Sequence, residues 1–143
     1  MAHTNLAMLD EPMAFFDRAR ATRPIVVVIE DNYRSSIALA MLIDDWGYAC
    51  IAARSADEAM SALGRRLDRV SAIVTDLQIF GKMSGIRDAS AIISKIGRNV
   101  PTIVTTGHGD FATLEGSFPV IRKPFDPEIL HKWLDRKIGI ANR

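Results

Sequence analysis

Residues 25–29 form an unbroken run of apolar, β-branched side chains, Ile-Val-Val-Val-Ile. A strand with one face in water alternates apolar and polar residues, so a run without alternation predicts a strand that is buried on both faces. Similar runs are found at residues 48–53, 72–75, 102–105 and 119–121. Amphipathic helical stretches separate the runs, and this order predicts an α/β fold in which helices cover both faces of a parallel sheet.

Local signals place the helices between these strands. The helix after the first strand is expected to end at Gly47, and a capping-box pattern at residues 55–58 opens a second helix that reaches about residue 66. Asp126 followed by Pro127 predicts the start of the last helix. The residues expected to form the buried face of the first of these helices are Ile37, Ala38, Met41 and Leu42.

The first 23 residues differ in pattern from the rest of the chain. Two acidic residues and a proline at residues 10–12 are typical of a helix start, and apolar side chains follow at residues 13–16. We therefore expect residues 1–23 to be an N-terminal extension with a short helix. Residues 24–143 then form one domain, because the whole chain is about as long as one ordinary domain.

Charge and composition exclude several classes of partner. Eighteen Lys and Arg residues against 17 Asp and Glu residues give a formal net charge of +1, so no global field attracts nucleic acid or an anionic membrane. The longest apolar runs have about six residues, against the roughly 18 that a membrane span needs. The single Cys50 is expected to be a buried, reduced thiol. We expect a cytoplasmic protein without membrane insertion and without direct DNA binding.

Polar side chains follow four of the expected strands, at the point where each strand ends. Glu30 and Asp31 follow the first strand, Asp76 the third, Thr106 the fourth and Lys123 the fifth. In a parallel α/β sheet ligands bind outside the carboxyl ends of the strands, so these side chains share one edge. Three carboxylates there repel one another unless a cation lies among them, and all-oxygen donors favour Mg²⁺ or Mn²⁺. Such a centre suits the transfer of a phosphoryl group to a carboxylate.

Four short motifs at these strand ends, taken together and in order, resemble the receiver domain of two-component response regulators. The resemblance covers about residues 24–138 and is to the stand-alone, single-domain type. It implies a flavodoxin-like (βα)5 three-layer sandwich around a central five-stranded parallel sheet in the order 2-1-3-4-5. The motifs are Val28-Ile29-Glu30-Asp31-Asn32, Thr75-Asp76-Leu77, Val104-Thr105-Thr106-Gly107 and Arg122-Lys123-Pro124-Phe125.

The resemblance implies a phosphorylation site. Asp76 resembles the phosphoacceptor, which takes a phosphoryl group from a sensor histidine kinase or a histidine phosphotransfer protein, and Thr106 and Lys123 bind that group. The chain is then a signalling protein that acts on an unidentified protein target. It is not an enzyme beyond Mg²⁺-dependent self-phosphorylation and autodephosphorylation, and a homodimer stays open.

The resemblance implies a metal site as well. Asp31 resembles a direct ligand of Mg²⁺ or Mn²⁺, and Glu30 acts largely through a water molecule. Asp76 and the backbone carbonyl of Gln78 complete the set.

The chain departs from the family pattern at three places. In the loop after Asp76, Phe80 stands where the family usually has proline. This loop also has one residue more than usual before Gly85. Only 17 positions separate Thr106 from Lys123, so the fourth helix is expected to be short or absent. Val120 stands where the family has its switch aromatic, and Phe118 is the nearest substitute.

Two other functions stay open at this point. The first is a receiver-like interaction module that works without phosphorylation. The full set of Asp76, Thr106 and Lys123 argues against it, but the short fourth-helix region keeps it open. The second is a phosphatase with an aspartyl-phosphate intermediate on a related fold. Such enzymes normally place a second acid two residues after the nucleophile, and Gln78 at that position disfavours this alternative.

Overall fold

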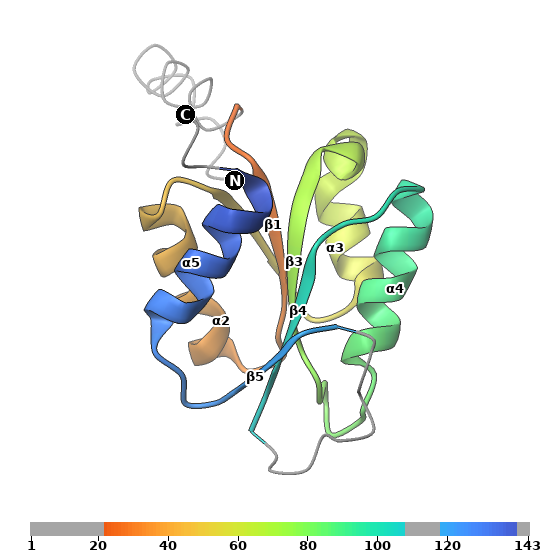
Figure 1. Ribbon diagram of the computed structural model, residues 1–143. Helices are drawn as coiled ribbons and strands as arrows, with labels where there is room; N and C mark the ends of the chain where they lie inside the picture. The colour runs from red at the N-terminus through yellow and green to blue at the C-terminus, as the bar shows by residue number, and fades with distance from the viewer. Residues whose placement is uncertain (1–21, 108–117, 140–143) are drawn as a thin grey trace, which may run out of the picture.

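A five-stranded parallel sheet forms the centre of the molecule, in the order β2-β1-β3-β4-β5 (Figure 1). The computed structural model describes residues 22–107 and 118–139. The order and the direction of the strands confirm the predicted sheet. The strands are β1 (Ile25–Ile29), β2 (Ala49–Ala53), β3 (Val70–Asp76), β4 (Thr102–Thr106) and β5 (Val120–Arg122).

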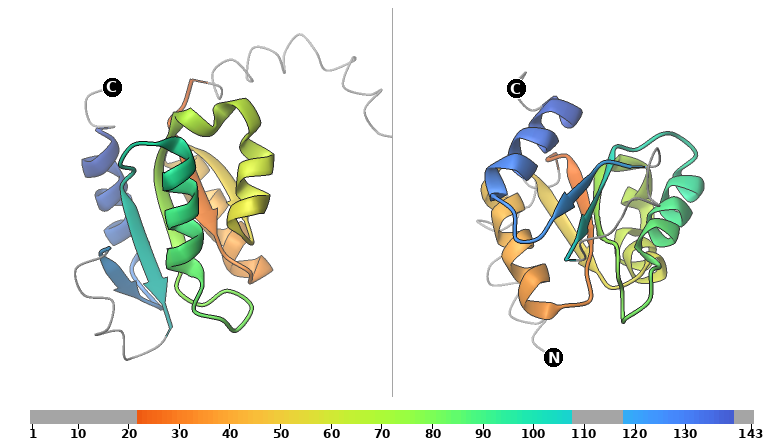
Figure 2. Two further views of the ribbon diagram at one scale, coloured as in Figure 1. Left: turned by 90° about the vertical axis from the view of Figure 1, so that its right-hand side faces the viewer. Right: turned by 60° about the horizontal axis from the view of Figure 1, so that its bottom comes forward.

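Helices cover both faces of this sheet, which makes the predicted three-layer sandwich. One face carries α2 (Tyr33–Asp45) and α5 (Pro127–Ile138), and the other carries α3 (Ala56–Leu63) and α4 (Gly85–Ile96) (Figures 1 and 2). The central strand β1 is buried along its whole length and contributes to two separate apolar layers. Val26 and Val28 pack in the layer with α2 and α5, whereas Val27 packs in the layer with α3 and α4. The unbroken apolar run is therefore explained by two covered faces.

Short polar side chains fix where the helices begin. Asn32 caps α2, because its side-chain oxygen accepts the backbone N–H of Ser35 at 2.9 Å. Ser55 caps α3 in the same way, as the capping-box pattern predicts. Asp126 caps α5 with Pro127 behind it, which confirms the predicted start of the last helix. These caps set the helices just after the strands, so the preceding residues stay at the carboxyl edge of the sheet.

The predicted buried face of α2 is wrong. The buried residues are Leu39 and Ile43, whereas Ile37 and Met41 are 40% and 68% exposed. Of the predicted set, only Leu42 is partly buried. The exposed side chains, with Tyr33, repeat every four residues just as the buried pair does. The apolar side chains of α2 therefore form two stripes with the same four-residue spacing, and the sheet covers only one of them.

The second helix also ends earlier than predicted. It stops at Leu63, and a 3₁₀ helix, η2 (Gly64–Arg69), continues the chain to β3. Gly64 has a φ of 53°, in the region that favours glycine, which interrupts the regular α-helix.

Two predictions fall outside the described residues. The predicted extension of residues 1–23, with its short helix, falls almost wholly on residues 1–21, and the region between β4 and β5 includes residues 108–117, all of which lie outside the described part of the chain. The predicted extension and the short fourth helix therefore stay predictions. Within the described residues, no helix is long and apolar enough to cross a membrane.

Candidate functional site

The carboxyl ends of four strands bring the predicted polar side chains to one edge of the sheet, at the bottom of Figure 1. Glu30 directly follows β1, Asp76 is the last residue of β3 and Thr106 is the last residue of β4. Lys123 directly follows β5, and its backbone N–H donates to the carbonyl of Thr106 at 2.7 Å. This bond links the backbone of Lys123 to the last residue of β4, so the pairing of β4 with β5 continues into the site.

Lys123 joins two of the carboxylates. Its Nζ donates to Oε1 of Glu30 at 2.8 Å and to Oδ2 of Asp76 at 3.1 Å. The side chain of Glu30 is only 2% exposed and that of Asp76 is 13% exposed. An ion pair shielded to this degree is screened much less by salt than a pair on the surface. The lysine ammonium is therefore a fixed positive charge beside the predicted phosphoacceptor.

The pKa values of this pair follow from burial and charge. Burial raises the pKa of the Glu30 carboxyl above its ordinary value, although hydrogen bonds from Lys123 and from the amide of Asn32 oppose this. Burial alone lowers the pKa of Lys123, but the hydrogen bond to Glu30 and the charge of Asp76 outweigh burial, so the pKa of the lysine is raised. Lys123 is therefore positively charged at neutral pH.

Three carboxylates at this edge fit a divalent metal ion. One ligand oxygen from each of Glu30, Asp31 and Asp76 lies within 4.8 Å of the other two. All are hard oxygen donors, which Mg²⁺ and Mn²⁺ prefer. Lys123 offsets only one of the three negative charges, so a cation stabilises the cluster. The predicted metal residues are thus brought together, whereas the role of the Gln78 carbonyl stays a prediction.

Hydrogen bonds orient the carboxylates of this cluster. The Oε2 atom of Glu30 accepts the backbone N–H of Asn32 at 3.0 Å, so both of its oxygens are engaged. The Oδ2 atom of Asp31 accepts the backbone N–H of Phe80 at 2.7 Å. Thr106 is buried at the end of β4, and its role in binding a phosphoryl group stays a prediction.

Two residues that support the acceptor were not predicted from the sequence. Gly85 begins α4 directly against β3, where a Cβ atom at this position would lie 1.7 Å from the carbonyl oxygen of Asp76. The hydroxyl of Thr75 lies 3.0 Å from that oxygen and 3.2 Å from the carbonyl oxygen of Gly85. The sequence signal for this close approach is the glycine itself, because glycine is a weak helix former and yet begins α4.

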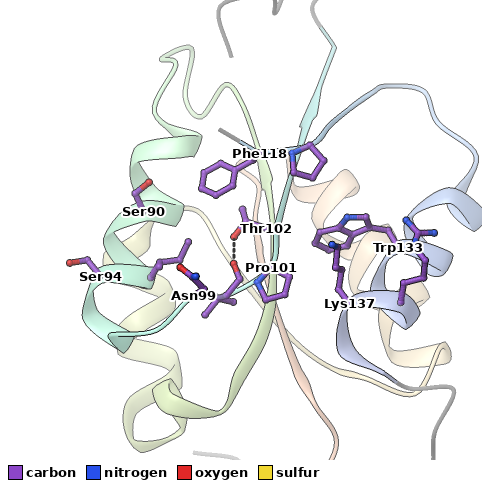
Figure 3. A pocket seen from close by; sticks show the side chains of 12 residues that line it. Ser90, Ser94, Asn99, Pro101, Thr102, Phe118, Trp133 and Lys137 are labelled. Atoms are coloured by element: carbon purple, nitrogen blue, oxygen red, sulfur yellow. Dashed lines mark hydrogen bonds between the residues drawn. The ribbon is translucent and has the colours of Figure 1, made fainter. Parts of the chain in front are cut away.

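Phe118, the predicted substitute for the switch aromatic, lies at the opposite end of β4 from Thr106. Phe118 lines a cavity of about 890 Å³ between α4 and α5, together with Thr102 at the start of β4 and Trp133 of α5 (Figure 3). Val120 is partly buried in β5. Phe118 therefore lies over the amino-terminal half of β4, and its substitution for the switch aromatic stays a prediction.

Comparisons with known proteins agree with this geometry. A model of the response regulator receiver domain matches residues 26–135. The transcriptional regulatory protein GlrR of Escherichia coli is 27% identical over 115 residues, which cover 77% of this chain and 25% of that protein. Nodulation protein W of Bradyrhizobium diazoefficiens is 31% identical over 116 residues, which cover 77% of this chain and 49% of that protein. The chain thus spans only a quarter to a half of the length of these relatives.

Solved structures share the fold. A receiver domain from Clostridium thermocellum has a TM-score of 0.67 and 25% identity, with 82% of this chain and 96% of that chain covered. The Vibrio cholerae chemotaxis protein CheY4 has a TM-score of 0.69 and 20% identity, with 81% and 99% covered. Since the family model matches most of the chain and the strand-end residues form one cluster, this protein belongs to the response regulator receiver domain family.

Proposed function

We propose that this protein is a phosphoacceptor in a two-component phosphorelay and that Asp76 receives the phosphoryl group. The observation that carries the proposal is the position of Lys123, whose ammonium group contacts both Asp76 and the buried Glu30. Asp31 adds a third carboxylate to the same cluster. A fixed cation beside a nucleophilic carboxylate, within a group of metal-binding oxygens, is what phosphoryl transfer to aspartate requires.

The proposed transfer is a displacement at phosphorus. An Oδ atom of Asp76 forms a bond to the phosphorus of a phosphohistidine, and the bond from phosphorus to the imidazole nitrogen breaks. The electron pair of that bond stays on the imidazole nitrogen. Lys123 offsets the negative charge of the phosphoryl oxygens, and the Thr106 hydroxyl donates a hydrogen bond to one of them.

A divalent cation fits the carboxylates of this site. Glu30, Asp31 and Asp76 would hold Mg²⁺ or Mn²⁺, with the carbonyl of Gln78 as a further ligand. The cation, when bound, supplies charge neutralisation that lets a carboxylate approach a phosphate. The chain's own contribution is that its fold holds the three carboxylates close to one another.

Exposed apolar side chains near this edge support a protein as the phosphodonor. Tyr33, Ile37 and Met41 form one stripe along α2, and Tyr33 lies at the end of the helix next to Asp31. Phe80, in the loop after Asp76, is 60% exposed. Apolar side chains gathered around a polar centre are typical of protein interaction sites. This favours a histidine kinase or a histidine phosphotransfer protein over a small-molecule substrate.

The remaining parts of the proposal concern the chain as a signalling component. We propose that it acts by binding a protein target and that it is not an enzyme beyond self-phosphorylation and autodephosphorylation. The net charge of +1 supports a domain that does not itself bind DNA. The apolar runs are short, which supports a cytoplasmic protein without membrane insertion.

The test is the intact mass of the protein after incubation with acetyl phosphate and Mg²⁺. We expect one phosphate adduct in the wild type, none in Asp76→Ala and none when EDTA replaces Mg²⁺. Asp68→Ala is the matched control, because Asp68 is an exposed aspartate in η2, before the amino-terminal end of β3 and therefore at the opposite edge of the sheet. An adduct that persists in Asp76→Ala refutes the assignment of the acceptor. A folded wild type that takes no phosphate from acetyl phosphate or from a phosphorylated histidine kinase favours the module that works without phosphorylation.

A further inference from the structure

The loop after Asp76 contains a tight turn whose two central residues, Phe80 and Gly81, both have positive φ, at 52° and 76°. Ile79 and Lys82 flank them and exchange two backbone hydrogen bonds, of 2.7 and 3.0 Å. This is the pattern of a type I′ turn, which normally takes Asn or Gly at both central positions. Phe80 is the only described residue other than glycine with positive φ. An aromatic residue kept in this conformation needs an explanation from its surroundings.

The side chain of Phe80 does not supply that explanation. It is 60% exposed, whereas the preceding Ile79 is buried and belongs to the apolar layer under α3 and α4. The backbone of Phe80, by contrast, makes a long-range contact. Its N–H donates to Oδ2 of Asp31 at 2.7 Å, across 49 positions of the sequence. A hydrogen bond to a carboxylate is about twice as strong as one between neutral groups.

Residue 80 could not make this bond as a proline, because proline has no backbone N–H. A shorter loop with a proline at this position therefore leaves Asp31 without this donor. The extra residue and the exchange of proline for phenylalanine, both visible in the sequence, thus act together. They form a turn whose first central amide points at a carboxylate of the acidic cluster.

We propose that the turn of residues 79–82 is a positioning element for Asp31, acting through the backbone N–H of Phe80. The bond fixes Oδ2 and leaves the other carboxylate oxygen of Asp31 oriented for a divalent cation. Donors of this kind, which bind a metal ligand rather than the metal, typically change metal affinity by about 10–100-fold when removed. The inference rests on the proposed function, because it requires that Asp31 binds the cation.

The experiment removes the N–H group, and its control reproduces the one side effect, a weaker Ile79 carbonyl for the hydrogen bond from Lys82. Replacing Phe80 by its α-hydroxy analogue, phenyllactic acid, turns the amide into an ester and keeps the ring. The matched control is the corresponding ester at Lys82, which removes the N–H that donates to the Ile79 carbonyl and keeps the N–H of Phe80. A third variant, Phe80→Gly, removes the ring but keeps the N–H and suits positive φ. The probe is Mn²⁺ alone, with its dissociation constant measured by electron paramagnetic resonance.

We expect the ester at position 80 to raise the dissociation constant of Mn²⁺ about tenfold. The ester at position 82 and Phe80→Gly should both stay within about twofold of the wild type. A position-80 ester that binds Mn²⁺ as tightly as the wild type overturns the inference. So does a loss of affinity in Phe80→Gly equal to that in the ester, because the ring would then be responsible.

A second measurement tests the same inference without the ester variant, and so applies even if that variant does not fold. Exchange of the Phe80 amide proton with solvent, followed by nuclear magnetic resonance, should be slower than that of Gly81 and slower again with Mg²⁺. Asp31→Ala should abolish the protection at Phe80, and unchanged protection in this variant overturns the inference. Failure of the proposed function has a different signature, since Mn²⁺ then binds the wild type and Asp31→Ala equally or not at all.

Discussion

Replacement of Gly85 by alanine tests how closely α4 must approach the phosphoacceptor. The new Cβ would lie 1.7 Å from the carbonyl oxygen of Asp76 and 2.8 Å from its carbonyl carbon. An ordinary contact between carbon and a carbonyl oxygen is about 3.3 Å, so the helix start and the end of β3 must separate by roughly 1.6 Å. The atoms in the way are backbone atoms, which a rotamer change cannot move aside.

The magnitude follows from two opposing effects. Overpacking of this kind costs about 3 kcal/mol at the upper end of its usual range. Exchanging glycine for alanine in a helix returns up to about 1 kcal/mol. We therefore expect Gly85→Ala to lower the free energy of unfolding by about 2 kcal/mol, which corresponds to a fall in Tm of roughly 6–8 °C for a domain of this size. The displaced Asp76 should also take up phosphate more slowly from acetyl phosphate.

The assay is urea and thermal unfolding followed by circular dichroism. Gly107→Ala is the matched control, because Gly107 also lies at the carboxyl edge of the sheet but a Cβ there meets nothing within 4 Å. We expect this control to stay within about 0.5 kcal/mol of the wild type. A Gly85→Ala protein as stable as the wild type would refute the close approach of α4 to Asp76.

Three further predictions concern other contacts. Lys123→Met leaves the buried Glu30 carboxylate without its cation and should cost about 3 kcal/mol at pH 7.5. Burial raises the pKa of Glu30 and Lys123 opposes this, so loss of the lysine raises that pKa further; the carboxyl is then protonated in acid, and the cost should shrink when urea unfolding is repeated near pH 4.5. Tyr48→Phe removes the hydroxyl that donates to Asp135 and should lower the urea unfolding free energy by about 1–2 kcal/mol; an unchanged value would show that this bond adds nothing. Burial, with the charge of Asp44, raises the pKa of Cys50 to about 12, so iodoacetamide should label the native thiol far more slowly than the urea-unfolded one at pH 8, and equal rates would contradict this.

The sheet and the acidic cluster could be predicted from the sequence because each depends on local chemistry. A β-branched run such as residues 25–29 has few alternatives to a strand buried on both faces. Residues that directly follow parallel strands must meet at one edge, which is why Glu30, Asp76 and Lys123 were grouped correctly. The strand order was implied by the family resemblance and not by the residues alone.

Other features depend on contacts between distant segments, which a single sequence does not specify. The exposed stripe of Tyr33, Ile37 and Met41 has the same spacing as the buried stripe, so its periodicity gave the wrong face of α2. The conformation of Phe80 is opposite to the preference of an aromatic residue, and it is held by a bond to Asp31, 49 positions away. The need for glycine at position 85 arises only when α4 lies against β3.

The most direct test of the central claim is to identify the residue that carries the phosphoryl group. Borohydride reduces an aspartyl phosphate to homoserine, so peptide mass spectrometry after phosphorylation and reduction locates the acceptor. The account predicts homoserine at position 76 alone, in an amount that depends on Mg²⁺ and falls strongly in Lys123→Met. Homoserine at another aspartate, or conversion at position 76 that is unaffected by both Mg²⁺ and the loss of Lys123, would contradict it.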